Sequence, residues 1–173
     1  SVAAGIAVLA AVPAQANSVN GIVDVWKVGV SGQFLCGTAA FAPGTGGTSC
    51  GPTSMSWGDT TGYGQSGLSI SNLAAANVNT FGGAYAGTIA PNTSVTHFNQ
   101  PITGNSLDKV TLESTLTLTP FSPAGGTLAP EVLKFLINFE ETTNDPRPSA
   151  CADGGTYGVG VNGNGCADIF VID

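Results

Sequence analysis

Apolar and polar residues alternate most clearly in residues 107–119. In an extended conformation one side of this segment carries Val110, Leu112, Leu116 and Leu118. The other side carries mainly threonine, with one lysine and one glutamate. A period of two residues predicts a β-strand with one face on a core and the other in water.

Residues 130–140 repeat the pattern, with apolar side chains at Leu133, Phe135, Ile137 and Phe139. A helix is the alternative, with Pro130 near its first position and Glu131 in its first turn. A strand is favoured because the run Phe-Leu-Ile-Asn-Phe is rich in residues that prefer β structure.

Shorter segments extend the β pattern on both sides of these two. We predict a strand at residues 22–28 and a loop-rich hairpin at residues 34–51. Residues 167–172 form a continuous apolar run, which predicts a strand buried on both faces. The expected architecture is all-β: an antiparallel β-sandwich or jelly roll formed by residues 17–173 as one domain.

The four cysteines form two local pairs, Cys36 with Cys50 and Cys151 with Cys166. Three connectivities are possible, and disulfides between neighbours are favoured because each would close a glycine-rich loop. Zinc ligands are usually spaced more closely. Disulfides indicate an oxidising, extracellular compartment.

Charge excludes two classes of partner. Only 9% of the residues are charged, and the net charge is −7 with four scattered basic residues. No basic surface is therefore expected for nucleic acid or for an anionic membrane.

Residues 1–16 form an apolar N-terminal segment with two open interpretations. The first is a secretory signal, because Ala14 and Ala16 fit a signal-peptidase site. The second is a retained donor strand, because an apolar strip needs a groove to bury it and is too short to span a bilayer as a helix. The large side chains available for assembly are those of Val2, Ile6, Val8 and Val12.

Four short motifs follow one another along the chain: Trp57-Gly58, Thr96-His97-Phe98-Asn99, Phe139-Glu140-Glu141-Thr142-Thr143-Asn144 and Cys166-Ala167-Asp168-Ile169-Phe170-Val171. Their order and spacing resemble the THxN family, secreted bacterial proteins sorted by a PEP-CTERM tail. Residues 54–58 and 65–70 resemble two successive strands of the family, and Thr143 replaces a proline of the family pattern. The resemblance implies a location outside a Gram-negative cell or on its surface, and no established activity. The family's tail and last strands are not in this sequence, so we expect an open groove.

His97 is the only histidine. A structural role is favoured over a metal ligand or a general base, because no nucleophile motif is present and Thr96 and Asn99 beside it suit hydrogen bonding at a strand end. Oxygen donors that suit calcium occur at Glu140, Glu141, Asn144, Asp145 and Asp153, but their spacing fits a solvated loop better. Glu140 and Glu141 are adjacent and would point to opposite faces, which argues against a hydrolytic pair.

The favoured function is that of a non-enzymatic structural protein of the bacterial surface or biofilm matrix, without a cofactor. It would self-associate, for example as a filament subunit joined by donor-strand exchange. The alternative is a module that binds extracellular polysaccharide through aromatic side chains, for which the candidates are Trp26, Trp57, Tyr63, Tyr85 and Tyr157.

Overall fold

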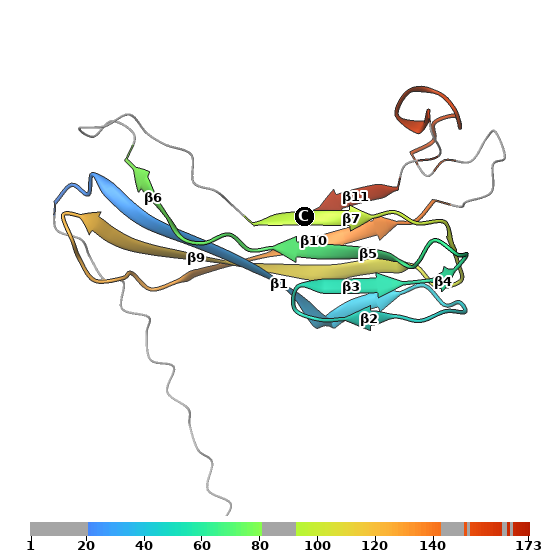
Figure 1. Ribbon diagram of the computed structural model, residues 1–173, viewed down its shortest axis with the longest axis horizontal. Helices are drawn as coiled ribbons and strands as arrows, with labels where there is room; N and C mark the ends of the chain where they lie inside the picture. Colours follow the sequence, from blue (N-terminus) through green and yellow to red (C-terminus); the bar gives the residue numbers. More distant parts are fainter. Residues whose placement is uncertain (1–20, 81–92, 143–150, 152, 164–165, 167) are drawn as a thin grey trace, which may run out of the picture.

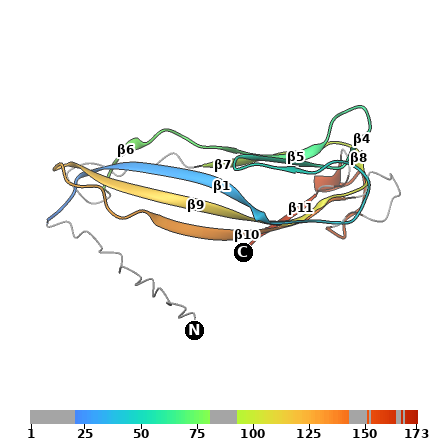
Figure 2. The ribbon, with the colours of Figure 1, turned by 90° about the horizontal axis from the view of Figure 1, so that it is seen from below.

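The computed structural model describes residues 21–80, 93–142, 151, 153–163, 166 and 168–173. Antiparallel strands form two facing layers (Figures 1 and 2). No α-helix occurs among the described residues, where the only helical element is the 3₁₀ turn η1 (Gly160–Asn162). The all-β prediction is therefore confirmed.

One layer is a five-stranded sheet in the order β11-β10-β9-β1-β6, which we call the long sheet. Its strands are β1 (Val25–Phe41), β6 (Ala76–Asn79), β9 (Leu107–Ser122), β10 (Glu131–Glu140) and β11 (Ile169–Ile172). The second layer is the short sheet, ordered β2-β3-β5-β7. Its strands are β2 (Ser49–Cys50), β3 (Ser54–Trp57), β5 (Ser66–Ser71) and β7 (Ser94–Phe98), and β4 (Asp59–Thr60) pairs with β8 (Ile102–Thr103) beside it.

The two strands predicted from alternation are confirmed. β9 contains residues 107–119, and β10 coincides with the segment for which a helix was the alternative. In β9 the fully buried Leu107 and Val110 face the core, while the threonines lie on the opposite face. The period of two was informative because these strands bury one face only.

The hairpin predicted for residues 34–51 is wrong in its first half, where β1 continues to Phe41. The local composition does not predict this continuation of the strand, because the strand contains a bulge. The pairing with β9 shifts between Leu35 and Ala40. Within the bulge the Thr38 hydroxyl donates to the Leu35 carbonyl at 2.7 Å and accepts from the Thr111 N–H at 2.9 Å, so the bulge is stabilised by its own side chain.

The core lies between the short sheet and the facing part of the long sheet. Its buried members are Phe34, Met55, Trp57, Leu68, Ile70, Ile102, Leu107, Val110, Ile137 and Phe139. β5 has 6 residues and spans about 20 Å, whereas β1 has 17 residues and spans about 55 Å. The short sheet therefore covers only part of the long sheet, as Figure 1 shows.

The two layers are joined along β1. The Asn72 side chain, at the end of β5, accepts from the Gly32 N–H at 2.6 Å and donates to the Gly32 carbonyl at 3.1 Å. The Phe34 N–H donates to the Pro52 carbonyl at 2.8 Å. The Cys36–Cys50 disulfide adds a covalent link between β1 and β2, which confirms the first predicted pair.

The opposite side of the sandwich lies between the edge strands β7 and β11, and we call it the seam. These strands pair with β5 and β10 and not with each other. The prediction that residues 167–172 are buried on both faces is wrong, because β11 is an edge strand and Ile172 is 61% exposed. An apolar run does not distinguish a central strand from an edge strand, because the two differ only in the number of neighbouring strands that pair with them.

Candidate functional site

Side chains from all four sequence motifs meet at the seam. They come from the end of β3, from β7, from the end of β10 and the residues after it, and from β11 and the residues leading into it. We call this group the seam cluster: Trp57, His97, Phe139, Glu141, Thr142, Asp168 and Phe170. The motifs are far apart in the sequence, so only the fold brings them together.

Aromatic rings form the apolar half of the seam cluster. The ring of His97 lies nearly parallel to that of Trp57, with centroids 6.3 Å apart. It meets Phe139 and Phe170 edge-on at 5.3 Å and 5.0 Å. Trp57 is completely buried, so His97 caps the core at the seam and contacts both layers. Such contacts contribute about 0.5–1.5 kcal/mol for each aromatic pair beyond the burial of area.

Hydrogen bonds form the polar half. The indole N–H of Trp57 donates to Glu141 Oε2 at 2.9 Å. Asp168 Oδ1 accepts from both the backbone N–H and the hydroxyl of Thr142, at 2.9 Å and 2.6 Å. His97 Nε2 lies 3.6 Å from Asp168 Oδ2, too far for a hydrogen bond. Among the residues that the structure describes, three buried side-chain atoms have no hydrogen-bond partner: His97 Nε2, Glu141 Oε1 and Asp168 Oδ2.

Burial dominates the protonation of the seam cluster. It raises the pKa of Glu141 from 4.5 to about 7; the Trp57 hydrogen bond opposes this rise, and the nearby charge of Asp168 adds to it. Burial also lowers the pKa of His97, against the attraction of Asp168. The favoured state at neutral pH is a neutral imidazole beside a partly protonated Glu141.

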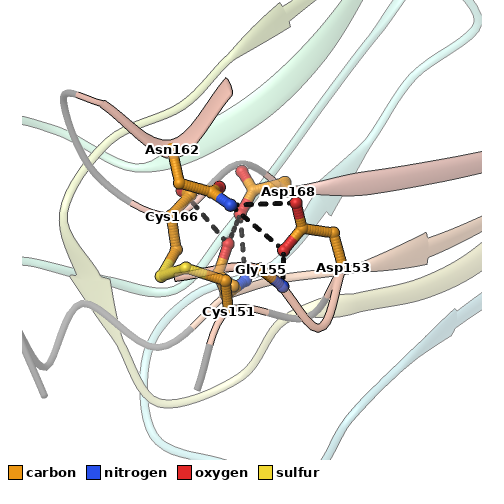
Figure 3. The surroundings of a disulfide bond; sticks show 7 residues. Cys151, Asp153, Gly155, Asn162, Cys166 and Asp168 are labelled. Carbon is orange, nitrogen blue, oxygen red and sulfur yellow. Dashed lines mark hydrogen bonds between the residues drawn. A yellow bond between two sulfur atoms is a disulfide. The ribbon is translucent and has the colours of Figure 1, made fainter. Parts of the chain in front are cut away.

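The second disulfide fixes the chain that leads into Asp168. Cys151 and Cys166 are bonded as predicted, with Cα atoms 5.0 Å apart. Inside the closed loop, Asp153 accepts from the Gly155 N–H at 2.8 Å and from the Asn162 side chain at 2.9 Å (Figure 3). The Cys166 carbonyl accepts from the Thr142 hydroxyl at 3.4 Å, which ties the disulfide to the seam cluster.

The calcium candidates are not brought together. Glu140 is exposed on β10, Glu141 faces the seam cluster, and Asp153 is engaged within its loop; Asn144 and Asp145 lie outside the described residues. No group of three or more His, Cys, Asp or Glu side chains in the described part of the chain could hold a metal ion. The orientation of Glu140 and Glu141 in opposite directions agrees with the argument against a hydrolytic pair.

Hydrogen bonds and ring contacts connect the side chains of the cluster across the two layers. Ser66 is fully buried, and its hydroxyl donates to the Gln100 carbonyl at 3.2 Å and accepts from the Gln100 N–H at 3.1 Å. Thr96 and Asn99, which the motif singled out, are exposed and lie outside the cluster. Sequence reasoning missed the roles of Glu141, Thr142 and Asp168, although these residues stand in the motifs quoted above.

The aromatic candidates for polysaccharide binding are not assembled into a platform. Trp57 is inaccessible, and Trp26 is half-buried in β1. Tyr63 and Tyr157 are exposed but belong to separate loops, and Tyr85 lies outside the described residues. A cleft of about 330 Å³ lies at the junction of the sheets, lined by Ser31, Gly32, Gln33, Pro52, Thr53, Asn72 and Thr115, without an aromatic residue.

The inner face of the long sheet continues beyond the short sheet as an apolar surface. Phe34 faces the core, so alternation places Val28 and Val30 of β1 on the same face, and their partners are Leu118 and Leu116 of β9. Leu133 of β10 shares this face and is 55% exposed. We call these five residues the acceptor face; the four on β1 and β9 are half-buried among the described residues.

Comparisons with protein-family models, with curated proteins and with solved structures found no match to this chain. Among the described residues, no helix has the length and apolar character needed to cross a membrane. The two disulfides are compatible with an extracellular protein.

Proposed function

We propose that this chain is a non-enzymatic structural protein of the bacterial surface or extracellular matrix, and that its copies assemble by donor-strand exchange. Residues 2–12 of one copy would cover the acceptor face of the next. The resemblance to the secreted THxN proteins supports the extracellular location, and the two disulfides agree with it.

The observation that carries the proposal is the acceptor face. Water-exposed apolar surface on a sheet is unfavourable by roughly 25 cal/mol for each Å², and soluble monomers rarely leave large patches of it. Leu133 points inward from β10 and still exposes 55% of its surface. A strand from another copy would remove this surface from water.

The dimensions and chemistry of residues 2–12 suit that role. Eleven extended residues span about 36 Å. The part of β1 that precedes the contact of Asn72 with Gly32 comprises residues 25–31 and spans about 23 Å, so the segment is long enough to cover it. The segment has no charge, and its alternating positions offer large side chains at Val2, Ile6, Val8 and Val12 and small ones at Ala3, Ala7 and Ala11. Head-to-tail repetition of such a contact produces an open polymer.

Removal of residues 1–16 tests the proposal. Intact mass spectrometry of the secreted protein first establishes whether the segment is retained, and light scattering then compares the full chain with the shortened one. We expect a polymer from the full chain and monomers from the shortened chain. A mature protein that begins after Ala16, or equal assembly by both proteins, would contradict the proposal.

Substitutions within the segment provide the matched control. Ile6→Asp and Val8→Asp place a charge among the large apolar side chains and should weaken assembly. Gln15→Asp adds the same charge outside residues 2–12 and should leave assembly unchanged. Equal effects of all three variants would indicate a general effect of charge instead of strand docking.

A further inference from the structure

The two sides of the sandwich are held together by different kinds of bond. Along β1, the Cys36–Cys50 disulfide and the hydrogen bond from the Phe34 N–H to the Pro52 carbonyl connect the layers through covalent and backbone links. At the seam, β7 and β11 do not pair with each other, and the seam cluster connects the layers through side chains. The sandwich therefore has one side fixed by its backbone and one side that depends on side-chain chemistry.

Two polar contacts cross the seam from one layer to the other. The indole N–H of Trp57 on β3 donates to Glu141 after β10, and His97 on β7 lies 3.6 Å from Asp168 before β11. Trp57 is completely buried, and the side chain of Asp168 is only 4% exposed. Glu141 Oε1 and Asp168 Oδ2 are buried and have no hydrogen-bond partner among the described residues. An unpartnered buried oxygen makes the ionised form of a carboxyl group costly.

The groups that face Glu141 supply no positive charge to compensate its ionisation. From β3 and β5, the Trp57 indole and the Ser66 hydroxyl oppose the rise in its pKa without carrying a charge, and the charge of Asp168 adds to the rise. Burial lowers the pKa of His97 on β7, so its imidazole is neutral above pH 6.5. No lysine or arginine in the described part of the chain forms an ion pair with either carboxyl group. The preceding residue, the last of β10, is an exposed glutamate that points to the opposite side.

Ionisation of Glu141 therefore places a second negative charge near Asp168 inside the contact between the layers. The pKa of Glu141 is about 7 in the closed seam, compared with 4.5 for a hydrated carboxyl group. Because the pKa of the closed form is raised, the closed seam is favoured at acidic pH, and this preference is lost as the pH rises through about 7. Separation of the layers at the seam hydrates both carboxyl groups and leaves the links along β1 in place.

We propose that the seam cluster is a proton-operated latch between the two sheets, closed while Glu141 carries a proton and released locally when Glu141 ionises. On release, β7 with His97 moves away from Asp168. Trp57 then loses its hydrogen bond to Glu141 and contacts water. The latch makes the access of water to this end of the core depend on the external pH. It does not involve the acceptor face, so it is independent of the proposed assembly.

Hydrogen exchange of the Trp57 indole N–H measures the opening of the latch, because this proton is bonded to Glu141 in the closed seam. Its protection, corrected for the intrinsic exchange rate at each pH, is compared between the wild-type full chain and Glu141→Gln. Between about pH 4.5 and 7 the opened form loses the Glu141 proton while the closed form keeps it. The opening constant of the wild type relative to Glu141→Gln should therefore rise about tenfold between pH 6 and pH 9. The titration of His97 occurs in both proteins and cancels. Glu140→Gln is the matched control, and its opening constant relative to the wild type should stay constant.

Low concentrations of urea distinguish release of the latch from unfolding of the whole chain, because a local opening exposes little surface and depends weakly on denaturant. The Trp57 indole proton should exchange faster than the most protected amides of the central strand β9, and with a smaller dependence on urea. Equal protection and equal urea dependence at the two places would show that the seam opens only when the chain unfolds, which would overturn the latch. An opening constant whose ratio to that of Glu141→Gln does not change with pH would overturn it as well.

Discussion

Replacement of Glu141 by glutamine should stabilise the protein at alkaline pH and leave its stability unchanged at acidic pH. In the folded chain Glu141 is buried beside Asp168, and burial raises its pKa to about 7 from 4.5. Ionisation is therefore opposed in the folded state and not in the unfolded state. Glutamine mimics the protonated side chain and can still accept the hydrogen bond from Trp57.

The sign and size follow from proton linkage. Because the folded-state pKa is raised, the contribution of Glu141 is fully present below about pH 4.5 and is lost as the pH rises through about 7. This pKa difference corresponds to about 3 kcal/mol. Solvent screening at a partly exposed carboxyl reduces the expected loss to about 2 kcal/mol. Glu141→Gln should therefore be about 2 kcal/mol more stable than the wild-type protein at pH 8.

Urea unfolding followed by tryptophan fluorescence measures this difference, because Trp57 is fully buried in the folded state. The wild-type protein and Glu141→Gln are compared at pH 5 and pH 8. Glu140→Gln is the matched control, because Glu140 is the adjacent residue and is exposed. The explanation that burial disfavours the ionised carboxyl of Glu141 would be refuted if Glu141→Gln gained no stability at pH 8, or gained the same stability at both pH values.

Three further predictions concern the seam cluster and the disulfides. His97→Ala should lower the free energy of unfolding by about 2–4 kcal/mol through loss of ring packing, whereas His97→Phe should retain most of the stability in the same urea titration. Because burial lowers the pKa of His97, its contribution to stability should fall as the pH drops below 6.5, and the His97→Phe variant should lack this component. Replacing both Cys36 and Cys50 by serine should cost about 3 kcal/mol by chain entropy, while non-reducing peptide mapping of the unmodified protein should recover only Cys36–Cys50 and Cys151–Cys166.

The sequence was most informative where structure is set by neighbours in the chain. Alternation in β9 and β10 predicts both strands, because each buries a single face against one core. The disulfide pairs were predictable because each joins residues 14 or 15 positions apart. The continuation of β1 to Phe41 was not predictable, because the bulge at residues 36–39 breaks the alternation and resembles a loop.

The seam cluster shows where the sequence was least informative. Trp57 and Glu141 are separated by 84 positions, and Thr142 and Asp168 by 26, so no local pattern connects them. The motifs identified His97 and marked the segments that contribute the other residues, but the pairing of the strands decides which side chains of those segments turn inward. Glu141 does so, whereas Thr96 and Asn99 remain exposed.

The most direct test of donor-strand assembly is a high-resolution electron cryomicroscopy reconstruction of the protein purified from the culture medium. The account predicts a polymer in which residues 2–12 of each subunit cover the acceptor face of the next, with side chains over Leu133. A monomeric protein, a mature chain without these residues, or a polymer in which they lie on their own subunit would contradict it.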